Sequence, residues 1–208
     1  MKKALAAAYR TLGERGIIVG SSGNVSVRTD AGMAITPSGG DPGGARASDM
    51  VSISLDGTVL GKGTPSSEWA MHAAIYKAKP EAACIVHAHS DACTALACLG
   101  KGLPGFHYMV VRFGGDDVPC APYTTFGTPA LADACAEAIR DRSACLLANH
   151  GMILHAKSVD AAISDAILLE QLCRQYLLAL SAGKPVLLTA KQIAEARERF
   201  KTYGPRPR

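Results

Sequence analysis

A chain of 208 residues, 48% hydrophobic and 19% charged, is long enough to bury one core, and no linker divides it, so we expect one domain over residues 1–208. The net charge of +4 comes from scattered basic residues, which argues against nucleic acid and is compatible with a small anionic metabolite. No apolar run approaches the ~20 residues of a membrane span. Seven cysteines without a C-x-x-C pair are typical of reduced thiols, and we expect a cytoplasmic protein.

The N-terminal half combines helical and hairpin patterns. Residues 2–16 have the periodicity of an amphipathic helix. Two hairpins should follow, with turns at T-D-A-G and at Asp56-Gly57. The segment T-P-S-G-G-D-P-G-G between them is poor in side chains and is expected to approach a ligand or another chain closely. Pro65 suits the first turn of a helix that runs to about Lys79.

The C-terminal half continues with strands and longer helices. A-A-C-I-V-H-A-H predicts a strand buried on both faces, and S-A-C-L-L-A-N-H-G-M-I-L-H predicts two strands hinged at N-H-G. Helices are expected over 129–142, about 157–182 and 190–202. Because hairpins alternate with helices, the sheet cannot be purely parallel. We therefore predict an α/β fold with three αβα layers and a central mixed, largely antiparallel sheet.

Three histidines are candidates for a metal site. Strand alternation places His87 and His89 on one face, where burying two imidazoles is costly unless their polar atoms are satisfied. A metal would satisfy them. His150 alone would be interpreted as a surface turn residue, and it becomes a third ligand only together with this pair. Three imidazoles can hold a catalytic divalent metal and leave one coordination position open.

Glu68 is the candidate acid/base. A carboxylate near a helix N-terminus is also favoured without any chemistry, because of the helix dipole. However, Ser66 and Ser67 in the same turn offer donors to an anion, and a phosphate there would bring a substrate's neighbouring carbons near Glu68. His72, one helical turn later, could orient the carboxylate. His155 ends a strand and is interpreted as structural.

Several motifs in register resemble the class II aldolase and epimerase family: S-G-N-V-S, T-P-S-G, P-S-S-E-W, H-A-H, H-Y-M, P-C-A-P-Y-T-T-F-G-T and N-H-G. The resemblance spans nearly the whole chain and is nearest to the fuculose-phosphate aldolase branch. It implies reversible retro-aldol cleavage of a ketose 1-phosphate to dihydroxyacetone phosphate and an aldehyde. Fuculose 1-phosphate, 5-deoxyribulose 1-phosphate and 5-methylthioribulose 1-phosphate all suit this reaction, and a pocket discriminates weakly between their aldehyde ends.

The resemblance also implies the ligands of the metal and the phosphate. Zn²⁺, or another divalent ion such as Mn²⁺ or Co²⁺, would bind His87, His89 and His150. Glu68 would be the exchangeable fourth ligand and the acid/base. The substrate phosphate would contact a set of small, neutral residues, namely Asn24, Ser38, Gly39, Ser66 and Ser67.

Family members are cyclic homotetramers with active sites between subunits. The resemblance therefore implies that Tyr108 reaches the neighbouring site as a second catalytic residue, the proton donor to the C4 oxygen in the synthetic direction. Phe126 and Tyr203 would line the aldehyde pocket. Arg112 stands where the family usually has a small apolar residue, and it would change the aldehyde end of that pocket.

Two alternatives stay open beside the aldolase. A sugar-phosphate 4-epimerase of the same family uses the same metal and the same cleavage, but that branch typically carries an aspartate where Glu68 stands. A non-catalytic adducin-like scaffold has the fold without a need for the metal histidines. The presence of Glu68, Tyr108 and all three histidines favours the aldolase.

Overall fold

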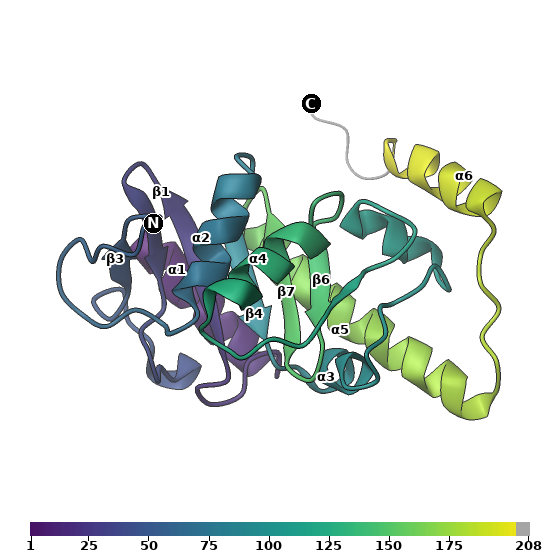
Figure 1. Ribbon diagram of the computed structural model, residues 1–208, viewed down its shortest axis with the longest axis horizontal. Coiled ribbons are helices and arrows are strands. Elements are labelled where there is room, and N and C mark those ends of the chain that lie inside the picture. Colours follow the sequence, from purple (N-terminus) through teal and green to yellow (C-terminus); the bar gives the residue numbers. More distant parts are fainter. Residues whose placement is uncertain (203–208) are drawn as a thin grey trace.

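The computed structural model describes residues 1–202, so the predicted pocket residue Tyr203 lies outside the described residues. Seven strands form one sheet with the order β3-β2-β1-β4-β7-β6-β5 (Figure 1). Neighbouring strands are antiparallel except for the parallel pair β5–β6. The strands are β1 (Gly23–Thr29), β2 (Gly32–Ile35), β3 (Val51–Ile53), β4 (Cys84–Ala88), β5 (Cys120–Ala121), β6 (Ala144–Leu147) and β7 (Gly151–Ala156).

Helices cover both faces of this sheet. One core joins the sheet to α1, α3 and α5, and a second core joins its other face to α2 and α4. Figure 1 shows α2 and α4 lying over the same face. The predicted three-layer αβα fold is therefore confirmed. The helices are α1 (Lys2–Glu14), α2 (Trp69–Ala78), α3 (Asp91–Ala97), α4 (Pro129–Ala138), α5 (Val159–Ala182) and α6 (Ala190–Phe200), with 3-10 turns η1 (Pro42–Gly44) and η2 (Tyr108–Phe113).

The central strand β4 is buried on both faces, as its continuous apolar run predicts. Val86 and Ala88 belong to the core beneath α1, α3 and α5, whereas Ile85 belongs to the core beneath α2 and α4. Alternation therefore puts His87 on the α2 side of the sheet. On β1, Val25 belongs to the core beneath α1, so the residues immediately before and after it in the strand point toward α2.

The helix after Pro65 starts later than its sequence predicts. Pro65 forms a β-bridge with Pro37, and the Ser66 N–H donates to the Thr36 carbonyl at 3.1 Å. This extended pairing keeps the chain out of the helix until Trp69. Likewise, the second hairpin has no full second strand, only the bridge between Ile53 and Val59.

The region between residues 90 and 128 contains elements that periodicity did not predict. Helix α3 begins directly after the H-A-H segment, and the Glu170 carboxylate on α5 accepts hydrogen bonds from the N–H groups of Ala92 (2.8 Å) and Cys93 (3.0 Å).

Beyond α5, helix α6 stands away from the sheet and packs on η2 (Figure 1). Within residues 1–202 no helix is both long and apolar enough to cross a membrane.

Candidate metal centre and active site

Glu68, His87, His89 and His150 converge at one edge of the sheet. One ligand atom from each lies within 4.8 Å of all the others. The imidazole centroids are 4.7–4.9 Å apart, and the rings cross at 72–76°. Three separate segments supply these residues: the start of α2, the end of β4 and the turn between β6 and β7. The predicted metal set therefore comes together in space.

The N-H-G segment forms the turn that presents His150. Asn149 has a φ of 54°, a left-handed conformation that asparagine tolerates better than most residues. At Gly151 a Cβ would lie 2.4 Å from the Ala88 carbonyl oxygen, so only glycine lets β7 approach β4 here. The segment thus combines a tight turn with a close strand contact beside the third histidine.

The tautomer of His87 follows from its partner. Its Nδ1 lies 2.9 Å from the Met152 carbonyl oxygen, which can only accept a hydrogen bond. Nδ1 therefore carries the hydrogen, and in the neutral ring Nε2 presents a lone pair to the centre. That Nε2 is 3.1 Å from Glu68 Oε2 and 3.0 Å from His89 Nε2. A carbonyl that fixes the ring and exposes the other nitrogen is the usual support of a metal-binding histidine.

A divalent cation fits this donor set. The Glu68 side chain is buried, and its Oε1 lies 3.2 Å from His150 Nε2 without forming a hydrogen bond of regular geometry. Lone pairs of buried nitrogen and oxygen atoms that face one another are costly unless a positive charge lies between them. Three imidazoles and one carboxylate are the ligand types that bind zinc and related metals.

The protonation states also suit a cation. Burial raises the pKa of Glu68, but contacts with His150 and His87 lower it more, so the net pKa is well below its usual range. Burial, with further contributions from His87 and His150, lowers the pKa of His89 to about 4. Near neutral pH the carboxylate is charged and the His89 ring is neutral, which are the forms that coordinate metals.

Behind Glu68 lies a buried polar contact between β1 and α2. The Asn24 amide Nδ2 donates to Glu68 Oε2 at 3.0 Å, and Asn24 Oδ1 lies 2.6 Å from His72 Nε2. His72 therefore reaches the carboxylate through Asn24, not directly as its helical spacing suggested. Ser26, which the sequence did not single out, lies 2.7 Å from the other His72 nitrogen. A usable signal was present, because two polar residues alternate with two valines in the buried part of β1.

The two loops that carry most of the proposed phosphate residues pair with each other. The Ser38 N–H donates to the Thr64 carbonyl at 3.0 Å, next to the Pro37–Pro65 bridge. The pairing is antiparallel, with Ser38 opposite Thr64 and Ser66 opposite Thr36. A cavity of about 340 Å³ adjoins the segment, and its lining includes Ser67, Glu68, His89, Tyr123, Phe126 and His150. Phe126 thus lines the same cavity as Glu68, His89 and His150.

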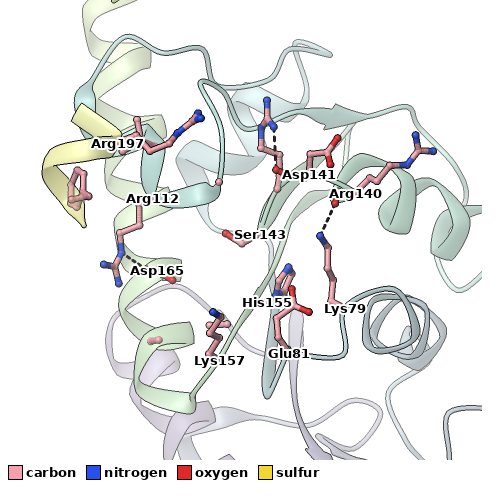
Figure 2. Close-up of a pocket in the computed structure, with 16 residues that line it drawn as sticks. Lys79, Glu81, Arg112, Arg140, Asp141, Ser143, His155, Lys157, Asp165 and Arg197 are labelled. Atoms are coloured by element: carbon pink, nitrogen blue, oxygen red, sulfur yellow. Dashed lines mark hydrogen bonds and ion pairs between the residues drawn. The ribbon is translucent and has the colours of Figure 1, made fainter. Parts of the chain in front are cut away.

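Tyr108 and Arg112 lie away from the metal cavity. Tyr108 is 53% exposed on η2, where its ring stacks near that of Phe200, and it does not line the metal cavity. Arg112 forms an ion pair with Asp165 at 2.8 Å and lines a separate cavity of about 720 Å³ (Figure 2). His155 also lines this second cavity, at the end of β7 away from His150.

The fold and this cluster of ligands define a class II aldolase domain. Residues 3–177 match the family described as Class II Aldolase and Adducin N-terminal domain, and the chain belongs to it. A 5-methylthioribulose-1-phosphate/5-deoxyribulose-1-phosphate aldolase of Rhodospirillum rubrum is 41% identical over 204 residues, 98% of this chain and 92% of the relative. The Escherichia coli L-fuculose phosphate aldolase is 41% identical over 190 residues, 91% of this chain and 88% of that protein.

A solved structure gives the same result. The structure of an L-fuculose 1-phosphate aldolase superposes with a TM-score of 0.92 at 38% identity, over 96% of this chain and 95% of that one. The family match and the aldolases among the relatives confirm the prediction of a class II aldolase, which is a carbon–carbon lyase.

Proposed function

We propose that this protein is a zinc-dependent aldolase that reversibly cleaves a ketose 1-phosphate to dihydroxyacetone phosphate and an aldehyde. The observation that carries this proposal is the complete set of three histidines around a buried carboxylate. Relatives named for 5-methylthioribulose 1-phosphate, 5-deoxyribulose 1-phosphate and fuculose phosphate support a substrate of this class. An adducin-like scaffold would have no use for these ligands.

The chemistry divides between the metal ligands and two proton carriers. His87, His89 and His150 would hold the ion, and Glu68 would be its exchangeable ligand. A bound divalent cation supplies Lewis-acid stabilisation of the negative charge that develops on the substrate oxygens. Glu68 carries the proton to and from C3, because it is the only carboxylate of the metal set.

Small neutral donors would hold the phosphate and so place C3 near Glu68. Ser38, Gly39, Ser66 and Ser67 lie on the two paired loops, and backbone N–H groups there add further donors. Asn24 uses one amide hydrogen on Glu68 and keeps a second one for the phosphate. The Asn24 side chain would then both bind the substrate phosphate and hold the carboxylate that transfers the proton.

Tyr108 would act in the site of a neighbouring subunit. Its side chain is exposed and does not line the cavity of its own subunit. Tyr123 and Phe126, which do line that cavity, are also exposed, at 62% and 66%. Exposed aromatic side chains beside a polar cavity are typical of an interface. We therefore propose a homotetramer with the active sites between subunits, in which the partner's Tyr108 protonates the C4 oxygen in the synthetic direction and accepts that proton in cleavage. Arg112, held by Asp165, would act on the same interface and not on the aldehyde.

Glu68→Gln tests the proposed function. The variant should keep the metal through the three histidines yet lose turnover by a factor of about 10²–10⁴, because glutamine cannot carry the proton. Metal analysis and a coupled assay for dihydroxyacetone phosphate measure the two effects. Glu81→Gln, far from the metal ligands in the fold, is the matched control. Full activity of Glu68→Gln would refute the assigned role.

Product analysis separates the aldolase from the epimerase. The wild-type protein should release free aldehyde from at least one of the three ketose 1-phosphates, and the ratio of their kcat/KM values identifies the preferred aldehyde end. Accumulation of a C4 epimer without free aldehyde would overturn the aldolase assignment.

A further inference from the structure

We infer that His72 is a positioning residue for proton transfer, which acts through Asn24 to fix the Glu68 carboxylate. The inference rests on the proposed role of Glu68 and extends it to residues that do not touch substrate. Four buried side chains, referred to below as the support chain, lead from the interior to the carboxylate: Tyr76, Ser26, His72 and Asn24.

The donors and acceptors of the support chain have one consistent arrangement. A carboxylate oxygen only accepts, so the Asn24 amide must turn its Nδ2 toward Glu68 Oε2. Its Oδ1 then faces His72 Nε2 at 2.6 Å and must accept from it. The hydrogen of the neutral His72 ring is therefore on Nε2.

The remaining links follow from that tautomer. His72 Nδ1 is an acceptor, and the Ser26 hydroxyl at 2.7 Å is its donor. The Ser26 hydroxyl also lies 3.0 Å from the Tyr76 hydroxyl, and since its single hydrogen is used on His72, Tyr76 donates to Ser26. Burial lowers the pKa of His72 to about 3, so the ring stays neutral at working pH. Every hydrogen in the support chain points toward Glu68.

Burial makes this arrangement rigid. Ser26 and His72 are 0% exposed, Tyr76 is 1% exposed and Asn24 is 4% exposed, so water cannot replace a lost partner without rearrangement. Asn24 is also the partner of His87 across the β1–β4 pair. The support chain is thus tied to the strand that carries the metal ligands.

The result is a difference between the two oxygens of Glu68. Oε2 is held by Asn24, whereas Oε1 has only the 3.2 Å contact with the metal-site residue His150, which is not a regular hydrogen bond. The inferred consequence is that Oε1 takes the proton from C3 and returns it, while Oε2 stays hydrogen-bonded. Holding the carboxylate in one rotamer keeps Oε1 aimed at the substrate, and a misplacement of about 1 Å can cost on the order of 10²-fold in rate.

Two substitutions at one position test this inference. In His72→Gln the side-chain amide nitrogen can take the place of Nε2 and donate to Asn24, whereas the shorter amide of His72→Asn matches Nδ1 and does not reach Asn24. We expect His72→Asn to lower kcat by about tenfold or more, with KM changed less than about threefold and metal content unchanged. His72→Gln should recover most of the loss. Equal kcat values for the two variants, at equal thermal stability, would overturn the inference.

Tyr76→Phe tests the far end of the support chain. It removes one buried hydroxyl at the end of the support chain farthest from Glu68. We expect kcat to fall a few-fold without a change in KM. Tyr176→Phe, on α5 against Phe106, is the matched control. Unchanged kcat in Tyr76→Phe would remove Tyr76 from the support chain.

A spectroscopic measurement separates this inference from the proposed function. Long-range ¹H–¹⁵N correlation of His72 in the zinc-loaded protein should show the Nε2–H tautomer. An Nδ1–H tautomer would overturn the inference even if the enzyme is an aldolase. If no ketose 1-phosphate is cleaved, the proposed function fails, while the tautomer still decides the support chain.

Discussion

At the scale of single residues, the two proposed proton carriers occupy opposite environments. Glu68 is 8% exposed, and its neighbours hold its pKa well below the usual range. Tyr108 is 53% exposed on a 3-10 turn. A charged carboxylate inside the cavity suits exchange of a proton at carbon, whereas an exposed phenol needs a second surface to exclude water around it. In the proposed tetramer, Glu68 would therefore depend on its own subunit and Tyr108 on a neighbouring one.

Replacing Tyr108 by phenylalanine should slow cleavage by about 10²-fold, because the C4 hydroxyl loses the positioned group that accepts its proton as the C3–C4 bond breaks. Competitive inhibition by inorganic phosphate should stay close to that of the wild type, since the phosphate residues lie on other loops. Steady-state kinetics with and without phosphate measure both effects. A weaker phosphate inhibition with unchanged kcat would contradict this role.

Arg112 shows why proximity in sequence misleads at this scale. It lies four residues after Tyr108, and the sequence suggested that both face the aldehyde. In a 3-10 helix of three residues per turn, residues four apart point about 120° away from each other. The Arg112 side chain accordingly faces Asp165 on α5 in the second cavity (Figure 2).

At the scale of elements, the metal ligands are held by contacts between elements that are distant in the chain. His89 follows β4 and is directly succeeded by α3, a helix of only seven residues. The two oxygens of Glu170 on α5 accept the first N–H groups of α3. A carboxylate at a helix N-terminus is favoured both by hydrogen bonding and by the helix dipole. Glu170 thus steadies the segment that carries His89.

Glu170→Gln should lower the free energy of unfolding by ~1–2 kcal/mol, because the amide leaves one of the two N–H groups without an acceptor. It should also accelerate metal loss to a chelator. Urea unfolding and the rate of zinc release measure these changes. Glu195→Gln, on the exposed face of α6, is the control, and equal stability of the two variants would contradict the role of Glu170.

At the scale of the whole molecule, one subunit holds an incomplete set of the proposed catalytic groups. Glu68, two of the metal-site histidines and Phe126 line one cavity, and Tyr108 lies apart from it on η2, against α6. A closed ring of identical subunits would place the η2 surface of each copy against the cavity of the next. The activity would then require the assembly.

Mixing two inactive variants tests this arrangement. In tetramers reassembled from equal amounts of Glu68→Gln and Tyr108→Phe, about a quarter of the sites should combine both native residues, because each subunit contributes one of them independently. Activity should rise toward that fraction of the wild type. If the activity of the reassembled mixtures stays at the mean of the two variants, Glu68 and Tyr108 act within the same subunit, or the protein does not form the proposed tetramer.

Much of the fold could be predicted because its signals are local. Helical periodicity located α1, α5 and α6 to within a few residues, and alternation placed His87 and His89 on one face. The N-H-G segment predicted its own turn, since asparagine and glycine are the residues such a turn requires. By contrast, α3 and η2 are short and lack a clear period, so no pattern of residues predicted them.

The layers of the fold, the residue types of the metal set and the aldolase family were all predictable from local patterns and motifs. How Glu68 is held was not predictable in this way, because its contact with Asn24 joins residues 44 apart in the chain. The start of α2 also depends on a distant contact, since Pro65 pairs with Pro37, 28 residues earlier in the chain. The physical reason is that periodicity reports which face of an element is buried, whereas hydrogen bonds between elements depend on sheet order and register.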